Sequence, residues 1–576
     1  MHAKHGLLFI TLMTITTLAA PLTAAAKPDG NRVGTAQSPK IKSGTKVNTA
    51  KTPAPAKPQN KSANALTEDE RKDAIGAAVQ AILESYSKQK ATALSYCEDA
   101  MALLKPTDPE QFRANLMLMC LELYSRNDRP NDVLSLGETM RAELSDPKPL
   151  QSICFMEATA LTKLNDWTGA REKYETCPNQ DDSMILSNVA ELYMIEGDSP
   201  HAVRAYQKSL EHAPDNPHAI FGLATALERS GERDKAKAAF LKGVETDSDF
   251  SYLKDAFFEP KAETDFQTAY RMYAGHRYKE AKYYLDKYTA QEERPVYKAH
   301  GQALLDQVTA DLNSGKTALA AAYPVVLSNV RAAAISADAR YLAFASLVRT
   351  SPDEYRSEIW SLDTETGKTF LEMSCPKEII FDLAFDTDAP TLRALSTQHR
   401  YEADVTDQTR DHYIYENSTE TLPVALTTSG KSILAITPNA LLTASPWLNP
   451  YTESPLLSVP SNLSRVKISA DNSAAILTTA IKTELYDTAS QSLRRAFPKA
   501  FFVNSLAAHP QKNMFALGIQ SGAALVDEDG QLTDFFATQG QVVTLAFAPS
   551  GRFLMTLSEH TAEIWRIQPE EFHEEK

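Results

Sequence analysis

Residues 182–216 read DSMILSNVAELYMIEGDSPHAVRAYQKSLEHAPDN, and residues 217–249 read PHAIFGLATALERSGERDKAKAAFLKGVETDSD. At an offset of 34 residues, both segments carry small residues, a glycine and large apolar residues at the same places. The matching pairs are Ala190 and Ala224, Tyr193 and Leu227, Gly197 and Gly231, Ala202 and Ala236, and Tyr206 and Phe240. Small residues let two helices approach closely, and glycine turns the chain between them. The pattern therefore predicts stacked helical hairpins.

This pattern resembles the tetratricopeptide repeat (TPR), whose units end on a proline as the first segment does at Pro214. Weaker copies of it extend over residues 66–313. The resemblance implies about six repeats, a closing helix near 295–312 and a superhelix with a concave groove. We therefore expect an all-α TPR solenoid over 66–313.

The TPR resemblance also implies which side chains line the groove, because known members use fixed positions of each first helix. Those positions hold Phe155, Met184, Met194, Phe221, Phe266, Tyr270 and Tyr273. Members that bind a C-terminal carboxylate use Lys and Asn there, whereas this chain has Ser187 and Glu191. An apolar or helical ligand is the better match. The alternative is that several of these side chains only pack between helices. Six tyrosines between 270 and 288 are expected near the junction with the next domain.

The C-terminal half changes to a strand-like pattern. VVTLAFAPSGRFLMTLSEHTAEIWRI (542–567) and VRAAAISADARYLAFASL (330–347) share a strand, a polar turn and a second strand. Similar units recur at roughly 35–50 residues, which is typical of the blades of a β-propeller. We expect an all-β propeller over 320–568, with six blades favoured and seven as the alternative.

The propeller pattern resembles the WD-repeat family and, more closely, the degenerate blades of TolB-type periplasmic propellers. Trp360 and Trp565 occupy the place of the family's tryptophan, but Ser361 and Arg566 replace the aspartate that follows it. The opening Gly-His pair is missing, so the buried His/Asp network of that family is not expected. The last unit has only three strands. We predict that 323–327 (YPVVL) supplies the fourth strand and closes the ring.

The first 65 residues differ from the rest. Residues 1–26 combine a basic start, an apolar run and small residues at 24–26, the layout of a secretory signal peptide. The alternative is an uncleaved membrane anchor. Residues 27–65 contain eight Lys or Arg and one Asp, and are rich in Pro and Ala, which predicts a disordered basic linker. It is a spacer or, alternatively, a tether to anionic envelope surfaces. Residues 569–576 form an acidic tail.

Four of the five cysteines form two pairs, each separated by 23 residues: Cys97 with Cys120, and Cys154 with Cys177. Each pair spans the turn between two predicted helices, at similar distances from that turn. In an oxidising compartment two disulfides are therefore a reasonable hypothesis, with small buried thiols as the alternative. Cys375 has no evident partner.

The sequence contains no catalytic or cofactor-binding motif. A nucleophile elbow, a phosphate loop and ligand-spaced histidines are all missing, so we expect no catalytic residue, no metal site and no cofactor. DEDG at 527–530 is interpreted as a hairpin turn rather than a calcium loop. The net charge of −15 argues against nucleic acid as a partner.

Taken together, these patterns predict an exported scaffold that is not an enzyme. Its TPR groove and a propeller face would bind protein partners of the cell envelope, in the periplasm or after secretion. No transmembrane segment is expected in the mature chain. The alternatives are a propeller-based periplasmic enzyme or ligand sensor, and a secreted effector.

Overall fold

The structure is a computed structural model with two compact units, residues 1–180 and 181–576. It describes residues 66–86, 89–144, 148–251, 261–290, 295–315, 318–351, 354–396, 398–406, 413–416, 422–426, 433–436, 441–444, 454–457, 463–479, 481–498 and 501–567. The predicted signal peptide, basic linker and acidic tail lie outside these residues.

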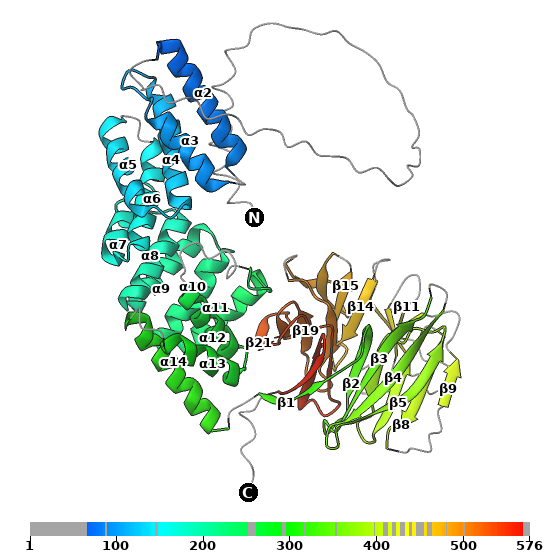
Figure 1. The fold of residues 1–576 in the computed structure, drawn as a ribbon. Coiled ribbons are helices and arrows are strands. Elements are labelled where there is room, and N and C mark those ends of the chain that lie inside the picture. Colours follow the sequence, from blue (N-terminus) through cyan, green and yellow to red (C-terminus); the bar gives the residue numbers. More distant parts are fainter. Residues whose placement is uncertain are drawn as a thin grey trace, which may run out of the picture. The chain divides into compact units, whose positions relative to one another are not determined.

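The described residues of the first unit form three helical hairpins (Figure 1). Their helices are α2 (Glu68–Ser85), α3 (Lys90–Met101), α4 (Glu110–Arg126), α5 (Pro130–Glu143), α6 (Lys148–Lys163) and α7 (Trp167–Glu175). Local chemistry starts several of them. Thr67 and Glu70 form a reciprocal capping box at the start of α2, and Pro130 lies in the first turn of α5, where its missing N–H is not needed.

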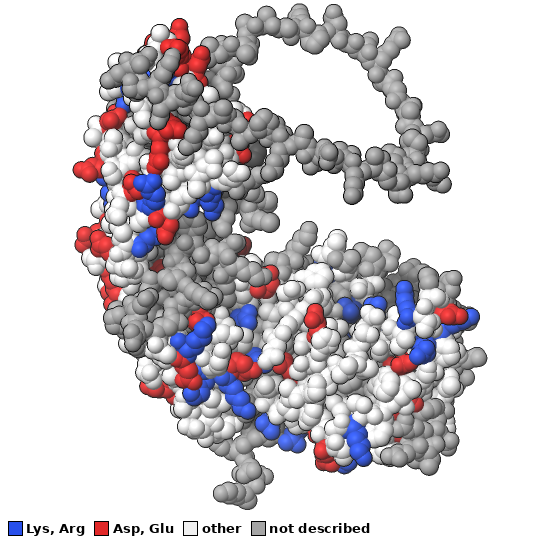
Figure 2. Space-filling model, in the orientation of Figure 1, with Lys and Arg blue, Asp and Glu red and all other residues white. Residues whose placement is uncertain are grey.

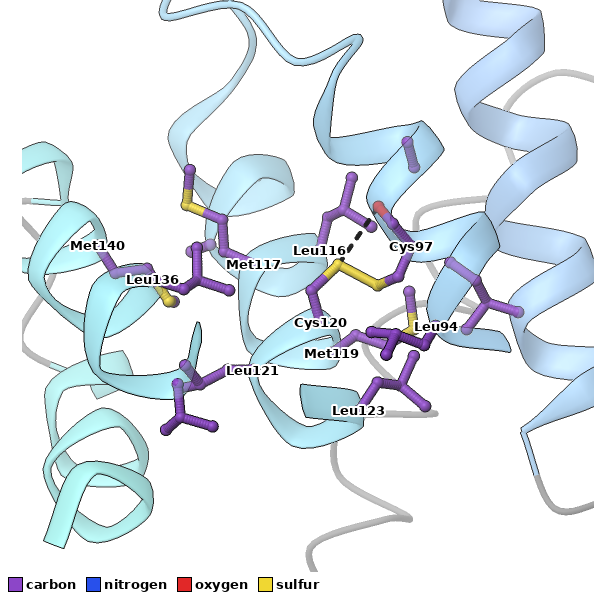
Figure 3. Packing of buried hydrophobic residues seen from close by; sticks show 14 of the residues in the cluster. Leu94, Cys97, Leu116, Met117, Met119, Cys120, Leu121, Leu123, Leu136 and Met140 are labelled. Carbon is purple, nitrogen blue, oxygen red and sulfur yellow. Dashed lines mark hydrogen bonds between the residues drawn. A yellow bond between two sulfur atoms is a disulfide. The ribbon is translucent and has the colours of Figure 1, made fainter. Parts of the chain in front are cut away.

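The core of the first unit is made of apolar side chains from α2 to α6. Figure 3 shows Leu116, Met117 and Leu121 of α4 packed between α3 and α5. Cys97 and Cys120 are buried in the same core. Apolar side chains packed between neighbouring helices therefore hold the hairpins together.

The described part of the second unit begins with seven more helices. They are α8 (Ser183–Glu196), α9 (Ser199–His212), α10 (Pro217–Arg229), α11 (Arg233–Thr246), α12 (Lys261–Ala274), α13 (Tyr278–Thr289) and α14 (Pro295–Asn313). Gly197 and Gly231 adopt φ angles of 82° and 78°, the left-handed conformation that lets the chain turn between two helices of a hairpin. The four repeat alanines are completely buried at helix contacts: Ala190, Ala202, Ala224 and Ala236. The hairpin pattern read from the sequence is confirmed, and α14 occupies the place of the expected closing helix.

The rest of the second unit is a β-propeller. The described strands form six four-stranded antiparallel sheets, the number of blades that the sequence favoured. In chain order the strands are β1 (Leu319–Pro324), β2 (Val330–Ile335), β3 (Tyr341–Arg349), β4 (Tyr355–Asp363), β5 (Lys368–Pro376), β6 (Asp382–Phe385), β7 (Thr391–Leu395), β8 (His399–Asp404), β9 (Tyr413–Glu416), β10 (Leu422–Leu426), β11 (Ile433–Ile436) and β12 (Leu441–Ala444). They continue with β13 (Ser454–Leu457), β14 (Leu463–Ile468), β15 (Ala474–Thr479), β16 (Thr483–Asp487), β17 (Leu493–Ala496), β18 (Ser505–Ala508), β19 (Phe515–Ile519), β20 (Gly522–Val526), β21 (Leu532–Ala537), β22 (Thr544–Phe547), β23 (Phe553–Ser558) and β24 (Thr561–Arg566).

The first strand of each blade lines the centre of the ring. These inner strands are β2, β6, β10, β14, β18 and β22, and each contacts the next around a closed circle, with β22 beside β2. All six therefore run in the same direction along the central channel, and their first residues gather at one end of it. We call this end the entry mouth.

The ring is closed as predicted, by a strand from the start of the domain, but with a corrected register. β1 pairs with β24, so that the last blade takes its outer strand from the start of the domain. The strand is 319–324, however, and not 323–327 as predicted: Tyr323 pairs with Ala562, and Val325 only donates a last backbone hydrogen bond to His560. The sequence signal was misleading because the residues at 325–327 are more β-prone than the alanines that form the strand.

Polar residues stabilise the turns after the inner strands. Ser336 donates to Asp338 and accepts from the backbone N–H of Tyr341. Ser469 does the same with Asp471 and the backbone N–H of the residue at 474. His509 has the equivalent place after β18. Side chains that satisfy backbone groups in this way fix a short turn and hence the blade geometry.

Within the described residues, no helix combines the length and the apolar character that crossing a membrane requires.

Candidate functional site

The turn between α12 and α13 joins the helical repeats to the propeller. Arg277 in this turn forms an ion pair of 2.5 Å with Glu563 of β24, and both side chains are only 2% exposed. Arg277 also binds Glu280 at 2.5 Å and donates to the carbonyl oxygen of Ala537 at 3.3 Å. Burial raises the pKa of Glu563, and the neighbouring Arg277 only partly opposes this. A buried charge that keeps hydrogen-bonded partners of opposite sign holds two elements in one fixed geometry.

A second group of contacts lies beside this ion pair. His276 donates to Asp534 of β21 at 2.9 Å, and Lys237 of α11 lies 3.3 Å from the same carboxylate. Burial alone would raise the pKa of Asp534, but His276 and Lys237 outweigh it, and the pKa lies below its usual value. The backbone N–H of Ala537 donates to the carbonyl of Gly275 at 3.1 Å. A Cβ on Gly275 would lie 2.5 Å from the Cβ of Ala537, so only glycine permits this approach.

Aromatic rings fill the space between α11 and β21. The centroids of Phe240 and Phe250 lie 6.0 Å and 6.1 Å from that of Phe535, and all three rings are almost completely buried. Ser521, in the turn between β19 and β20, donates to the carbonyl of Ser248. We call the whole contact, from Phe240 to Glu563, the helix–propeller junction. It makes α11–α13 and the propeller a continuous packed structure within the second unit.

Most of the predicted groove residues pack inside the solenoid instead of lining an open groove. Met194, Phe221, Phe266 and Tyr270 are at most 5% exposed, so for these four the groove prediction is wrong. Phe221 shows the reason, because its ring packs against Phe240 and Phe250 at the junction described above. Large apolar side chains on the first helix of a hairpin pack against the next hairpin when they are most completely buried there.

The other three groove candidates retain solvent contact. Met184 at the start of α8 is 54% exposed. Phe155 is half-buried, with its ring against that of Tyr174. Tyr273 is half-buried beside Tyr278. Met184 is therefore the one groove candidate that offers most of its side chain to a partner.

Two of the tyrosines between 270 and 288 lie at the junction, where the sequence led us to expect them. The ring centroid of Tyr270 is 5.9 Å from that of Phe240, and the ring of Tyr278 packs edge-on against His276. Tyr283 is instead 64% exposed. The cluster thus contributes to the junction through some of its members only.

The four paired cysteines form disulfides in the structure. Cys97 of α3 is joined to Cys120 of α4, with Cα atoms 5.6 Å apart, and Cys154 of α6 is joined to Cys177, with Cα atoms 5.7 Å apart. The first bridge connects two neighbouring hairpins, and Figure 3 shows it within the apolar core. Cys177 lies just beyond the end of α7, and not on the helix as expected. Cys375 is a buried free thiol, and burial raises its pKa to about 11.

The described residues contain no group of three or more His, Cys, Asp or Glu side chains that could hold a metal ion.

On the face shown in Figure 2, acidic and basic side chains are interspersed over the helices, while much of the propeller surface is uncharged. The polar contacts of the junction, unlike its tyrosines, were not predicted from the sequence. Their partners are more than 200 residues apart, and no local pattern marks such a pairing.

The family model of the tetratricopeptide repeat matches residues 193–256, from the end of α8 to the segment after α11. The chain contains tetratricopeptide repeats. This TPR segment includes Phe240 and Phe250, so the matched repeats themselves contribute to the junction. The WD resemblance of the propeller stays a prediction.

Among solved structures, the chain is similar to one in "Crystal Structure of Mitotic Checkpoint Complex", with 12% sequence identity and a TM-score of 0.32. That similarity covers 43% of this chain and 95% of the other, and at this TM-score it carries no argument about function. The comparison with curated proteins gives no match.

Proposed function

We propose that this protein is an exported scaffold that holds protein partners together at the cell envelope. The observation that carries the proposal is the helix–propeller junction. TPR hairpins and propellers are both repeat folds that present extended surfaces for binding. Here a buried ion pair and packed aromatic rings join them, so partners bound to each would be held at a fixed separation.

The disulfides support export. Disulfides persist in oxidising compartments such as the periplasm and are rare in the cytosol. Both bridges lie in the first unit, where each one ties together two segments of the helical stack. The apolar start of the sequence, residues 1–26, is consistent with the same route.

The solenoid surface around Met184 is the favoured place for a partner. Met184 is an apolar side chain that remains 54% exposed, and methionine adapts its shape to different apolar ligands. Its position at the start of α8 places it on the first helix of a TPR hairpin, where TPR ligands bind. A short amphipathic segment of a partner is the ligand that such a side chain suits.

Affinity purification tests the proposal. The tagged full chain is crosslinked in its native cells, the cells are fractionated, and the proteins that co-purify from each fraction are identified. We expect a specific protein partner in the periplasmic or envelope fraction, recovered less well from a Met184→Glu chain than from the matched Arg204→Glu control on the exposed side of α9. Cytosolic location of the mature chain, or recovery of no specific protein, would contradict the proposal.

A further inference from the structure

The central channel of the propeller contains a cavity of about 480 Å³, a volume suited to a small ligand. Among the described residues, four cationic side chains line it, Arg331, Arg349, Arg465 and Lys467, but only one carboxylate, Asp382. The chain as a whole has the opposite balance, with a net charge of −15. An excess of positive charge in one enclosed place attracts anions.

The single carboxylate is already engaged. Asp382 accepts from Lys467 at 2.6 Å and from the backbone N–H of Leu426 at 2.7 Å. Lys467 also donates to the carbonyl of Leu426 at 3.1 Å. Lysine and aspartate thus neutralise one another between β6, β10 and β14, and the three arginines supply the excess charge.

The arginines lie at the entry mouth. Arg331 is the second residue of inner strand β2, and Arg349 ends β3, which runs antiparallel to β2 and so finishes at the same mouth. Arg465, on β14, lines the same cavity. All three are solvent-accessible, and no ion pair of theirs occurs among the described residues.

Two of these guanidinium groups repel each other. The pKa of Arg465 is lowered, first by the enclosing channel walls and then by the charge of Arg331. A bound anion would relieve the repulsion, and it would accept hydrogen bonds from guanidinium groups that form no ion pair within the described part of the chain.

We propose that the entry mouth binds a ligand with two or more carboxylate or phosphate groups, held by Arg331 and Arg465 with Arg349 beside them. Each guanidinium presents two parallel N–H donors that match the oxygens of such a group. The inference goes beyond the scaffold function and does not depend on which protein the solenoid binds. The same chemistry comes from a free small acid or from acidic side chains of a protein partner.

Calorimetry on the full mature chain tests this site with three probes: citrate, inorganic phosphate and a hexapeptide of glutamate. We expect saturable 1:1 binding of at least one probe, weakened at least about tenfold in an Arg331→Gln/Arg465→Gln chain and unchanged in the matched Arg204→Gln chain. Preference for citrate or phosphate identifies a free anion as the source, and preference for the hexapeptide identifies a partner's acidic segment.

Because Arg331 and Arg465 make no ion pair within the described part of the chain, the double variant should keep its thermal unfolding temperature, which the same samples report. Absence of binding by all three probes would overturn the proposal. So would equal binding by the double variant and the unsubstituted chain, because the anion would then be held elsewhere.

Discussion

Arg277 and Glu563 are 286 residues apart in the sequence, yet their side chains form a buried ion pair of 2.5 Å between a helical turn and the last strand of the propeller. Glu563 lies in β24, the strand that also closes the ring by pairing with β1. One ion pair therefore links the TPR hairpins to the closure of the propeller.

Removing one partner of this pair should be costly. We expect Arg277→Met to lower the free energy of unfolding of the second unit by about 3–5 kcal/mol, because it leaves Glu563 buried without its cation. Chemical denaturation measures the loss. The double variant Arg277→Met/Glu563→Gln should regain part of it; additive losses in the two single variants and the double variant would show that the residues do not interact.

The two disulfides predict how many cysteine thiols react before and after reduction. Denatured, unreduced mature protein should contain one reactive thiol, Cys375, and reduction should release four more. Each bridge closes a loop across 23 residues and should contribute about 3 kcal/mol to the stability of the first unit. A Cys97→Ala/Cys120→Ala chain, compared with the unsubstituted chain by denaturation, measures this. Five reactive thiols in unreduced protein purified from the native cells would contradict the assignment.

The fold could largely be predicted because it repeats. Ala190, Gly197 and Ala202 recur at a fixed spacing, and each copy reinforces the same interpretation. The groove residues could not be separated from core residues in this way. Phe221 and Met184 are both large apolar residues on first helices, and only the aromatic packing around Phe221 at the junction decides that it is buried.

Contacts between segments that are far apart in the sequence could not be predicted either. The channel arginines come from different blades, and only the ring brings Arg331 near Arg465. His509 is a similar case. The missing Gly-His pair gave no reason to expect a structural histidine, but His509 is buried and donates to the carbonyl of Gly551 in the next blade at 3.0 Å.

His509 predicts how stability depends on pH. Its Nδ1 accepts from the backbone N–H groups of Gln511 and Lys512, and burial lowers its pKa to about 4. In the unfolded chain the pKa is about 6.5. Well above this value, the group is neutral in both states. Between about pH 6.5 and pH 4 only the unfolded state binds the proton, so stability should fall by up to about 3 kcal/mol as the pH decreases.

Two measurements check this. NMR titration of the folded protein should give a pKa near 4 for His509. Denaturation at several pH values should show a weaker decline over this window in a His509→Gln chain than in the unsubstituted chain. Burial also lowers the pKa of His300 to about 4, but both chains contain His300, so the difference between them reports His509. A folded-state pKa of His509 near its usual value of about 6.5 would contradict the prediction.

Ring closure by β1 and β24 predicts cooperative unfolding. Deleting residues 542–576 removes three strands of one blade and exposes β1 and the neighbouring blades on both sides. We expect the whole propeller to lose its thermal transition, rather than a single blade. An unchanged transition in scanning calorimetry would show that the blades are stable without the pairing of β1 with β24.

Site-specific photocrosslinking in the native cells is the sharpest test of the scaffold function. A photoreactive amino acid replaces Met184, which is exposed on α8, or Arg204, which is exposed on α9 of the same hairpin. If the protein is an envelope scaffold, position 184 should give a discrete crosslinked product with an envelope or periplasmic protein, and position 204 a much weaker one. Equal crosslinking from both positions, or no product from position 184 in a folded and exported chain, would contradict this function.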